Sequence, residues 1–192
     1  MELDFNNWVF SSTVREFQDN ARGASMKLDF SYVIDSKCLW QMNKLRSKPI
    51  PRFVHINCNG LGGETAVGQK IIEKMLDWKQ KGSTLVGHVQ TECYSMHAGI
   101  LLYCDNLVVP DEAEILFHRI QKYKRGRLKP EFIPPYFNAS ELCIWRWLTD
   151  QVYHLKIKPL LTRYERFKYF LGYDIILTGA QLKERLSEIR RD

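Results

Sequence analysis

The sequence predicts a mixed α/β fold, because short buried-strand patterns alternate with amphipathic helices along its central part. The chain has 192 residues, of which 45% are hydrophobic, so it is long enough to bury a core. We therefore expect one domain over residues 1–192. The alternation predicts stacked parallel βαβ units with right-handed crossovers. Residues 1–30 carry weak signals, and we expect an irregular arm there.

The first elements after the arm are a helix, a strand and a second helix. Residues 36–44 predict a short helix that ends before Pro49 and Pro51. Residues 53–56 form a short apolar run typical of a buried strand. A turn-rich loop over 57–63 then opens a helix with an apolar stripe. The stripe consists of Val67, Ile71, Ile72, Met75 and Leu76.

The middle of the chain repeats this order. Residues 84–89 predict a strand, and an apolar helix begins near Ser95. Two further strands are predicted at 106–109 and 114–118. The last of these ends in His118, which places an imidazole at the end of a strand.

The final third is predicted to be helical. After a proline-containing connection, residues 139–156 predict a long helix and residues 159–170 a further one. Asp174 is expected in a loop between two helical segments. Thr178 is expected to cap the last helix.

Composition bounds the class of protein. The five cysteines are an odd number and contain no CxxC pair, so we expect neither a metal site nor a disulfide, and we expect no cofactor. The N-terminal residues lack a basic and apolar leader pattern. Without an apolar run of the ~18 residues needed to span a membrane, we expect no membrane contact and a soluble, cytoplasmic protein.

Positive charge gathers in one stretch. Arg119–Lys129 holds six cations and no anion, and residues 119–192 hold 16 basic against 8 acidic side chains. An acidic-peptide or nucleic-acid contact is one interpretation, and a solvated or subunit-facing loop is the other. We favour the loop, because no zinc-finger, RRM-like or Gly-rich phosphate signature accompanies it. Nucleic acid is therefore not an expected partner.

Three residue types needed for nucleophilic catalysis occur in order. Ser95 begins a helix, His118 ends a strand and Asp174 lies further on, which supplies a nucleophile, a base and an orienting carboxylate. A helix start leaves backbone N–H groups unpaired, so Met96 N–H is a candidate oxyanion donor. Gly63 is the second, because without a Cβ its N–H can approach a tetrahedral intermediate. The pattern predicts a serine peptidase.

The same residues resemble the motif series of the Clp protease proteolytic subunit (ClpP) family, over about residues 36–188. The matching stretches are Gly62–Gly68, the Ser95-Met96 helix start, Phe117-His118 and Asp174–Thr178. The resemblance implies Ser95 as nucleophile, His118 as general base and acid, and Asp174 as orienting carboxylate. It implies Gly63 and Met96 as the oxyanion hole.

The resemblance also implies a fold and an assembly. Members of this family have a crotonase-like stack of ββα units with a protruding handle helix, which 139–156 would form within a helical region reaching about residue 170. They form homo-oligomers, typically heptameric rings stacked in pairs. They degrade unfolded polypeptides delivered by a partner ATPase unfoldase. The chain would thus be an endopeptidase acting on extended polypeptides.

Departures from the family pattern keep other interpretations open. His97 stands where the family has glycine, and we assign it with Gly62 to substrate binding, although its ring could instead point away along the helix. The basic residues 122–129 replace the family's glycine-rich strand. One alternative is a non-catalytic scaffold subunit of the same fold. Another is a crotonase-type acyl-CoA hydratase or isomerase, and a third is a dedicated processing peptidase.

Overall fold

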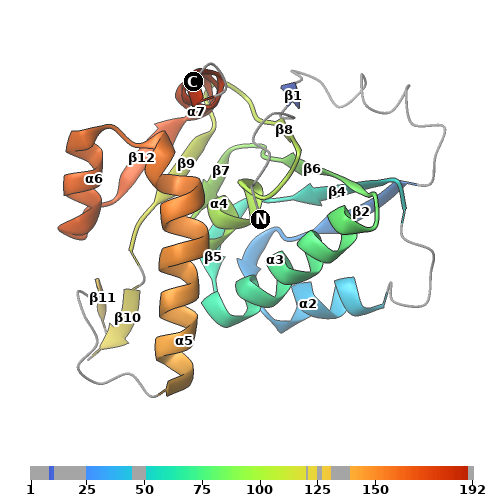
Figure 1. Ribbon diagram of the computed structural model, residues 1–192, viewed down its shortest axis with the longest axis horizontal. Coiled ribbons are helices and arrows are strands. Elements are labelled where there is room, and N and C mark those ends of the chain that lie inside the picture. Colours follow the sequence, from blue (N-terminus) through green and yellow to red (C-terminus); the bar gives the residue numbers. More distant parts are fainter. Residues whose placement is uncertain are drawn as a thin grey trace.

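The chain is built around two five-stranded sheets, as the computed structural model shows (Figure 1). The predicted α/β class is therefore confirmed. The structure describes residues 9–10, 25–44, 51–119, 121–124, 127–130 and 139–189. Most of the predicted arm, and the predicted connection around residues 131–138, lie outside these residues.

The first sheet is parallel throughout, and its strands follow the order β1-β8-β6-β4-β2. They are β1 (Val9–Phe10), β8 (Asn106–Val108), β6 (Thr84–His88), β4 (Phe53–Asn57) and β2 (Ser25–Asp29). The predicted strands at 53–56, 84–89 and 106–109 are confirmed as β4, β6 and β8. The predicted arm over 1–30 is wrong at its end, because residues 25–29 pair with β4 as a regular strand.

The second sheet has the order β12-β9-β7-β5-β3, in which only β12 is antiparallel to its neighbour. Its strands are β12 (Ile175–Thr178), β9 (Glu114–Phe117), β7 (Glu92–Tyr94), β5 (Gly60–Gly63) and β3 (Tyr32–Ile34). The predicted loop over 57–63 is thus partly a strand. Asp174, expected in a loop between helices, immediately precedes β12 instead.

From β2 to β9, successive strands alternate between the two sheets, and a helix follows each of the first three pairs. Three ββα units end in α2 (Ser36–Asn43), α3 (Thr65–Gln80) and α4 (Met96–Leu101), and β8 and β9 form a fourth strand pair. The prediction of simple βαβ units is therefore wrong in this respect, because it missed the second strand of each unit. Buried side chains from both sheets and all three helices join one hydrophobic cluster.

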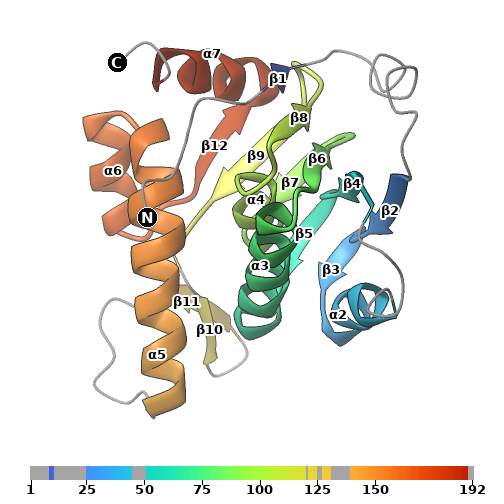
Figure 2. The same cartoon turned by 45° about the vertical axis from the view of Figure 1, so that its right-hand side comes forward.

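The helical third begins with a column that stands beside the sheets and extends past them (Figure 1, Figure 2). It consists of α5 (Ala139–Trp147), a π-helical stretch η1 (Leu148–Ile157) and a 3₁₀ turn η2 (Lys158–Leu160). The predicted helix over 139–156 is confirmed. Its second half is wider than predicted, because the buried residues Leu148, Val152, Tyr153 and Ile157 recur at steps of four and five, longer than the 3.6-residue α-helical turn.

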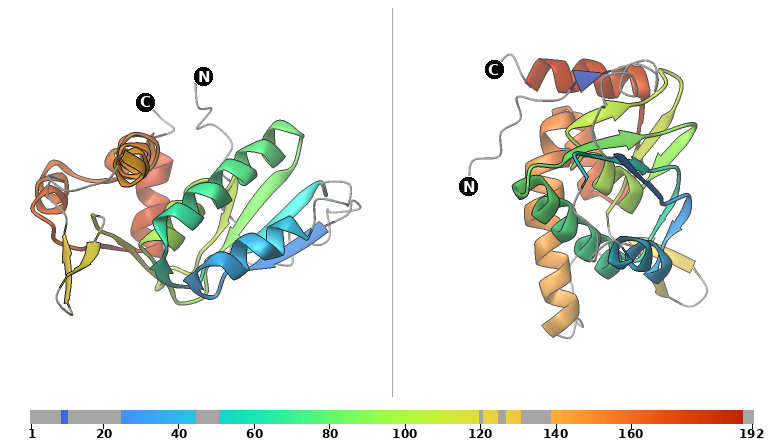
Figure 3. Two further views of the ribbon diagram at one scale, coloured as in Figure 1. Left: turned by 90° about the horizontal axis from the view of Figure 1, so that it is seen from below. Right: turned by 90° about the vertical axis from the view of Figure 1, so that its right-hand side faces the viewer.

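Two shorter helices complete this third. α6 (Arg163–Phe170) starts later than the predicted residue 159, at a capping box between Thr162 and Glu165. α7 (Gly179–Ile189) lies across one end of the sheets, while α5 runs down their side (Figure 3). The predicted cap at Thr178 is confirmed, since its hydroxyl accepts a hydrogen bond of 3.2 Å from the Gln181 N–H.

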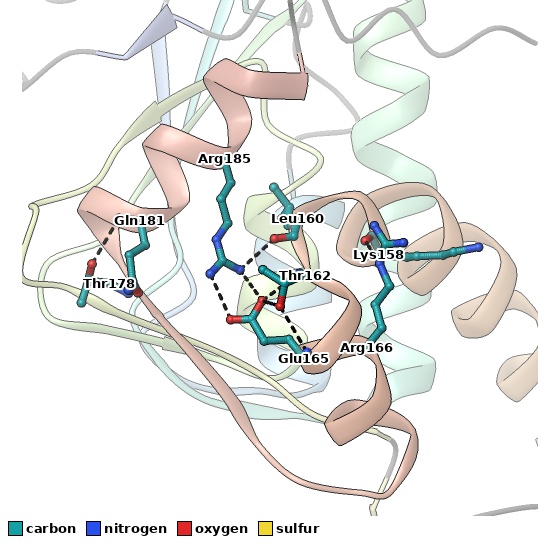
Figure 4. Close-up of polar contacts among 8 residues, drawn as sticks. All are labelled: Lys158, Leu160, Thr162, Glu165, Arg166, Thr178, Gln181 and Arg185. Carbon is teal, nitrogen blue, oxygen red and sulfur yellow. Dashed lines mark hydrogen bonds and ion pairs between the residues drawn. The ribbon is translucent and has the colours of Figure 1, made fainter. Parts of the chain in front are cut away.

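A polar network fastens α6 to α7 (Figure 4). The Arg185 guanidinium donates to both carboxylate oxygens of Glu165, at 2.7 and 3.0 Å, and to the Leu160 carbonyl at 2.9 Å. Burial by itself raises the pKa of Glu165, but the hydrogen bonds from Arg185 and Thr162 make the net shift downward. The network fixes α6 against the element that follows β12.

The basic stretch after His118 contains a β-hairpin rather than a plain loop. β10 (Gln121–Lys124) pairs in antiparallel fashion with β11 (Arg127–Pro130). The hairpin is a separate two-stranded sheet, and it projects from the two large sheets (Figure 1). In the parts of the chain just defined, no helix combines the length and apolar character that crossing a membrane requires.

Candidate active site

Ser95 occupies a sharp turn between β7 and α4. Its backbone has φ 56° and ψ −117°, a left-handed conformation that costs a non-glycine residue roughly 1–3 kcal/mol. Its N–H donates a hydrogen bond of 2.9 Å to the Leu116 carbonyl of β9, which holds the strained residue in place. A serine on such a strand-to-helix turn presents its hydroxyl away from the sheet, as nucleophiles of hydrolases do.

Gly62 makes room for this serine. Its φ is +108°, and a Cβ at this position would lie 2.6 Å from the Ser95 Cβ and 3.1 Å from its Oγ. Only glycine combines this backbone conformation with so close an approach. Gly68 has a similar role in the first turns of α3, where an added Cβ would clash with the side chain of Met96. The glycines of the sequence motif therefore set the position of the Ser95-Met96 turn.

His97 lies in the interior of the fold and does not line the cavity that contains Ser95, contrary to the sequence-based assignment to substrate binding. Its side chain is fully buried, and its Nδ1 accepts a hydrogen bond of 2.9 Å from the Gly62 N–H. Its Nε2 contacts the Phe30 carbonyl, to which it can donate. Burial lowers the pKa of His97, so the ring is neutral and fits these two roles. His97, on α4, thus connects β5 with Phe30, the residue that follows β2. Gly62 likewise supports Ser95 rather than lining the pocket.

One cavity of about 920 Å³ brings most of the predicted site together. Ser95, Met96, Gly63 and His118 all line it, although they come from different places along the sheets. The rest of the wall is largely apolar and is supplied mainly by β5, the helical column and α6. It includes Leu61, Leu148, Val152, Ile157, Tyr169 and Phe170. A volume of this size accepts a drug-sized molecule or a few residues of an extended peptide.

His118 is held by its own backbone and by α6. Its Nδ1 donates a hydrogen bond of 2.6 Å to the carbonyl of Arg119. The Tyr169 hydroxyl donates to the His118 carbonyl at 3.3 Å, and the Arg119 guanidinium donates to the Phe170 carbonyl at 2.9 Å. The His118 Nε2 is the ring nitrogen left for a hydroxyl or a substrate.

Asp174 lies close to His118 in the register of the sheet but does not contact its ring through a hydrogen bond. Ile175 pairs with Phe117 in an antiparallel ladder, so one further step brings Asp174 opposite His118. Asp174 is exposed, and within the described ranges no hydrogen bond joins its carboxylate to His118. Nor does one join the Ser95 hydroxyl to His118. The residues of the predicted triad are neighbours that are not hydrogen-bonded to one another.

Sequence reasoning missed the aromatic wall of the cavity. Tyr153 and Tyr169 stack with ring centroids 4.6 Å apart, and Phe170 meets Tyr153 edge-on at 5.4 Å. Burial raises the pKa of both tyrosines, so they stay protonated. The four-and-five spacing of buried residues in 148–157 was the sequence signal that could have indicated the Tyr153 face.

No protein-family model matches this chain, and no curated protein matches it either. Interpretation of the site therefore rests on its own geometry. Among the residues that the structure describes, no group of three or more His, Cys, Asp or Glu side chains could hold a metal ion. All five cysteines are free thiols. The cavity offers a hydroxyl, an imidazole and backbone donors, which suit acyl transfer.

Proposed function

We propose that the protein is a serine hydrolase that cleaves peptide bonds in extended polypeptides, with Ser95 as nucleophile. The observation that carries the proposal is the single cavity shared by Ser95, His118, Gly63 and Met96. Its second support is the left-handed backbone of Ser95, a strain of the kind that gathers at active sites.

The chemistry follows the acyl-enzyme route. The Ser95 Oγ attacks the peptide carbonyl while the His118 Nε2 takes the hydroxyl proton, and the carbonyl oxygen becomes an oxyanion facing the N–H groups of Gly63 and Met96. His118 returns the proton to the departing amine. A water then loses its proton to His118 and attacks the acyl group, which releases the acid and restores Ser95.

The strand arrangement supports placing the chain near the crotonase and ClpP folds. Three ββα units that feed two sheets are the repeat expected for such a stack, and the α5–η1 column takes the place of the handle helix. We extend the proposal to a divergent ClpP-type peptidase. Under this proposal the chain assembles into rings and receives substrate from an ATPase unfoldase.

Activation requires a small rearrangement at His118. In the present conformation its Nδ1 donates to the Arg119 carbonyl, whereas a working triad needs that proton directed at the Asp174 carboxylate. The β9–β12 register supports this exchange, since it places residues 118 and 174 opposite each other. Substrate binding or subunit contact would supply the energy for it.

A hydratase or isomerase of the crotonase type is the second candidate, because Glu64 also lines the cavity and such enzymes need an acidic residue there. Its chemistry would use backbone donors and Glu64, and it would not need the Ser95 hydroxyl. A scaffold subunit without activity would need neither Glu64 nor the Ser95 hydroxyl.

Active-site labelling tests the proposal. A fluorophosphonate probe should add the mass of one inhibitor per chain to the wild type and none to Ser95→Ala, as measured by intact mass. A folded, assembled protein that stays unlabelled would contradict the proposal. Full hydratase or isomerase activity in Ser95→Ala would instead establish the crotonase alternative.

Asp174→Asn tests the role of the carboxylate. Because Asp174 is exposed, we expect its free energy of unfolding to change by less than about 0.5 kcal/mol. Peptide cleavage should fall at least about a hundredfold, since the amide cannot stabilise the imidazolium of His118. Unchanged cleavage would remove Asp174 from the mechanism.

A further inference from the structure

Arg119 places a positive charge in the wall of the cavity that contains Ser95. Besides the His118 ring, the charged side chains that line it, among the described residues, are Arg119 and Glu64. Glu64 adjoins Gly63 in the chain, and Arg119 adjoins His118. The negative charge therefore lies on the wall next to β5, and the positive charge lies on the wall next to His118.

Tyr153 adds a hydrogen-bond donor to the Arg119 side. It lines the cavity and is 4% exposed, and its hydroxyl oxygen is buried without a hydrogen-bond partner in the described part of the chain. Burial raises its pKa, while the Arg166 and Arg119 guanidinium groups oppose the shift. The hydroxyl thus stays protonated next to two cations. Such a group is stabilised when a ligand supplies an acceptor, and an anionic acceptor suits the cations as well.

The chain that leaves the cavity at Arg119 continues the same charge. From Arg119 to Lys129 the sequence has six cations and no anion, and residues 121–124 and 127–130 form the two strands of the β10–β11 hairpin. The net positive charge of this segment favours an anionic ligand.

We propose that the cavity selects polypeptides that carry a carboxylate on the His118 side of the bond to be cleaved, and that Arg119 binds this carboxylate with the help of the Tyr153 hydroxyl. The inference rests on the proposed function and names its substrate class. The carboxylate is either an acidic side chain or the α-carboxylate of a chain end. The apolar wall would hold the neighbouring side chain of the same peptide.

The observations favour a peptide over a nucleic acid. The bases of a single-stranded nucleic acid stack on exposed aromatic side chains of the protein that binds it. Here Tyr153 and Tyr169 are both buried and stack on each other, so neither offers a free face. The exposed Phe170 and the half-buried Trp145 also line the cavity, and its other large apolar side chains are aliphatic, which suits an apolar side chain of a peptide.

Binding to the Ser95→Ala protein tests the inference without requiring catalysis. Three fluorescent peptides share an apolar core: one has an internal Glu and blocked ends, one has Gln and a free C-terminal carboxylate, and one has Gln and an amidated end. Fluorescence anisotropy should show a Kd at least about tenfold lower for one carboxylate peptide than for the neutral one. Which of the two binds tightly identifies the source of the carboxylate.

Charge reversal assigns the selection to Arg119. In the Ser95→Ala background, Arg119→Glu should abolish the preference and favour a matched peptide with Lys in place of Glu. Arg163→Glu changes the net charge equally but lies exposed on α6 away from the cavity, and it should keep the preference. Equal affinity for all three peptides, or a preference that survives Arg119→Glu, would overturn the inference. So would tighter binding of a single-stranded oligonucleotide.

Tyr153→Phe separates a ligand contact from a structural role. Because the hydroxyl has no partner in the described residues, its removal should leave the free energy of unfolding unchanged or higher. The affinity for the carboxylate peptide should fall severalfold, while the affinity for the neutral peptide stays constant. Equal loss for both peptides would overturn the role of Tyr153. Carboxylate selection without fluorophosphonate labelling would contradict the hydrolase but not the selection.

Discussion

The two sides of the cavity are held in different ways. On the nucleophile side, Ser95, Gly62 and His97 are joined by direct packing and by buried hydrogen bonds between elements distant in sequence. On the base side, His118 and Arg119 are half-buried and bond to backbone carbonyls of their own segment and of α6. Because buried contacts cost more free energy to open than partly exposed ones, we expect the His118 side to change partners more easily than the Ser95 side.

This difference indicates how the site divides its tasks. The proposed nucleophile and oxyanion donors belong to the sheets and to the turn that opens α4, where strain at Ser95 is sustained by the surrounding fold. The proposed base and its proposed carboxylate partner belong to the junction with the helical third, where small movements require little free energy. Substitutions on the nucleophile side should therefore affect stability most, and those on the base side should affect it least.

Gly62→Ala should have the largest effect on stability. The new Cβ would meet Ser95 at 2.6 Å, and alanine is strained at φ +108°, so we expect a loss of about 4 kcal/mol. Urea denaturation measures this loss, and fluorophosphonate labelling should disappear with it. Gly82→Ala is the matched control, because Gly82 also has a positive φ but faces open space, and it should cost only about 1 kcal/mol. Equal losses would show that contact with Ser95 is unimportant.

His97→Ala should come next, at about 3 kcal/mol, because it leaves a cavity and removes the partner of the Gly62 N–H. His118→Ala is its counterpart on the base side. It should cost less than about 1 kcal/mol in unfolding free energy and yet abolish peptide cleavage. If His118→Ala destabilises the protein as much as His97→Ala, the proposed contrast between the two sides is wrong.

Mild acid should weaken the sheet side specifically. Burial lowers the pKa of His55, His88 and His97, in His88 to about 4. The unfolded chain, with ordinary histidine pKa values near 6.5, then binds more protons than the folded chain below that pH. Stability is complete above about pH 6.5 and falls as the pH drops towards 4, by up to about 1.4 kcal/mol per pH unit for each extra proton. Urea denaturation at pH 7.5, 6 and 5 checks this, and a flat profile would contradict it.

A small effect is expected for the Arg185–Glu165 ion pair that joins α7 to α6. Arg185→Met removes the two-pronged contact with Glu165 and should cost about 1 kcal/mol, because the pair is only partly buried. Its consequence should be a slower fluorophosphonate reaction, since α6 also bonds to His118 and Arg119. Lys183 is on the same helix as Arg185, and Lys183→Met breaks its more exposed ion pair with Asp111. This control should change the free energy of unfolding by less than about 0.5 kcal/mol and leave the labelling rate unchanged.

The sequence predicted those elements whose signal is local. β4, β6 and α3 contain enough apolar residues at regular spacing to reveal their period, and Thr178 marks the start of its helix through capping chemistry. β3 and β7 have three residues each, too few to show alternation. In β12 the alternation of apolar and polar residues is hidden, because the exposed Ile176 between two buried residues is itself apolar.

The same distinction applies to the site. Ser95 and the Gly62-Gly63 pair could be predicted because helix starts and glycine-containing turns have recognisable patterns in adjacent residues of the sequence. The apposition of Asp174 and His118 depends on a strand pairing between distant segments of the chain, which no local pattern encodes. His97 was misassigned because its burial depends on Phe30 and Gly62, which lie far from it in the sequence.

The π-helical stretch η1 has a consequence for how this chain could change over time. A helix with i→i+5 bonding corresponds to an α-helix that has gained a residue, and such stretches are often found at functional sites. Loss of a single residue between Leu148 and Val152 would bring the four buried side chains to the spacing i, i+3, i+4 and i+8, which is one face of an ordinary α-helix. Without that loss, α-helical turns would carry Tyr153 and Ile157 to the side opposite Leu148, so the wide turns keep these residues on one face. A single deletion in this stretch should thus be accepted when the backbone narrows to α-helical turns.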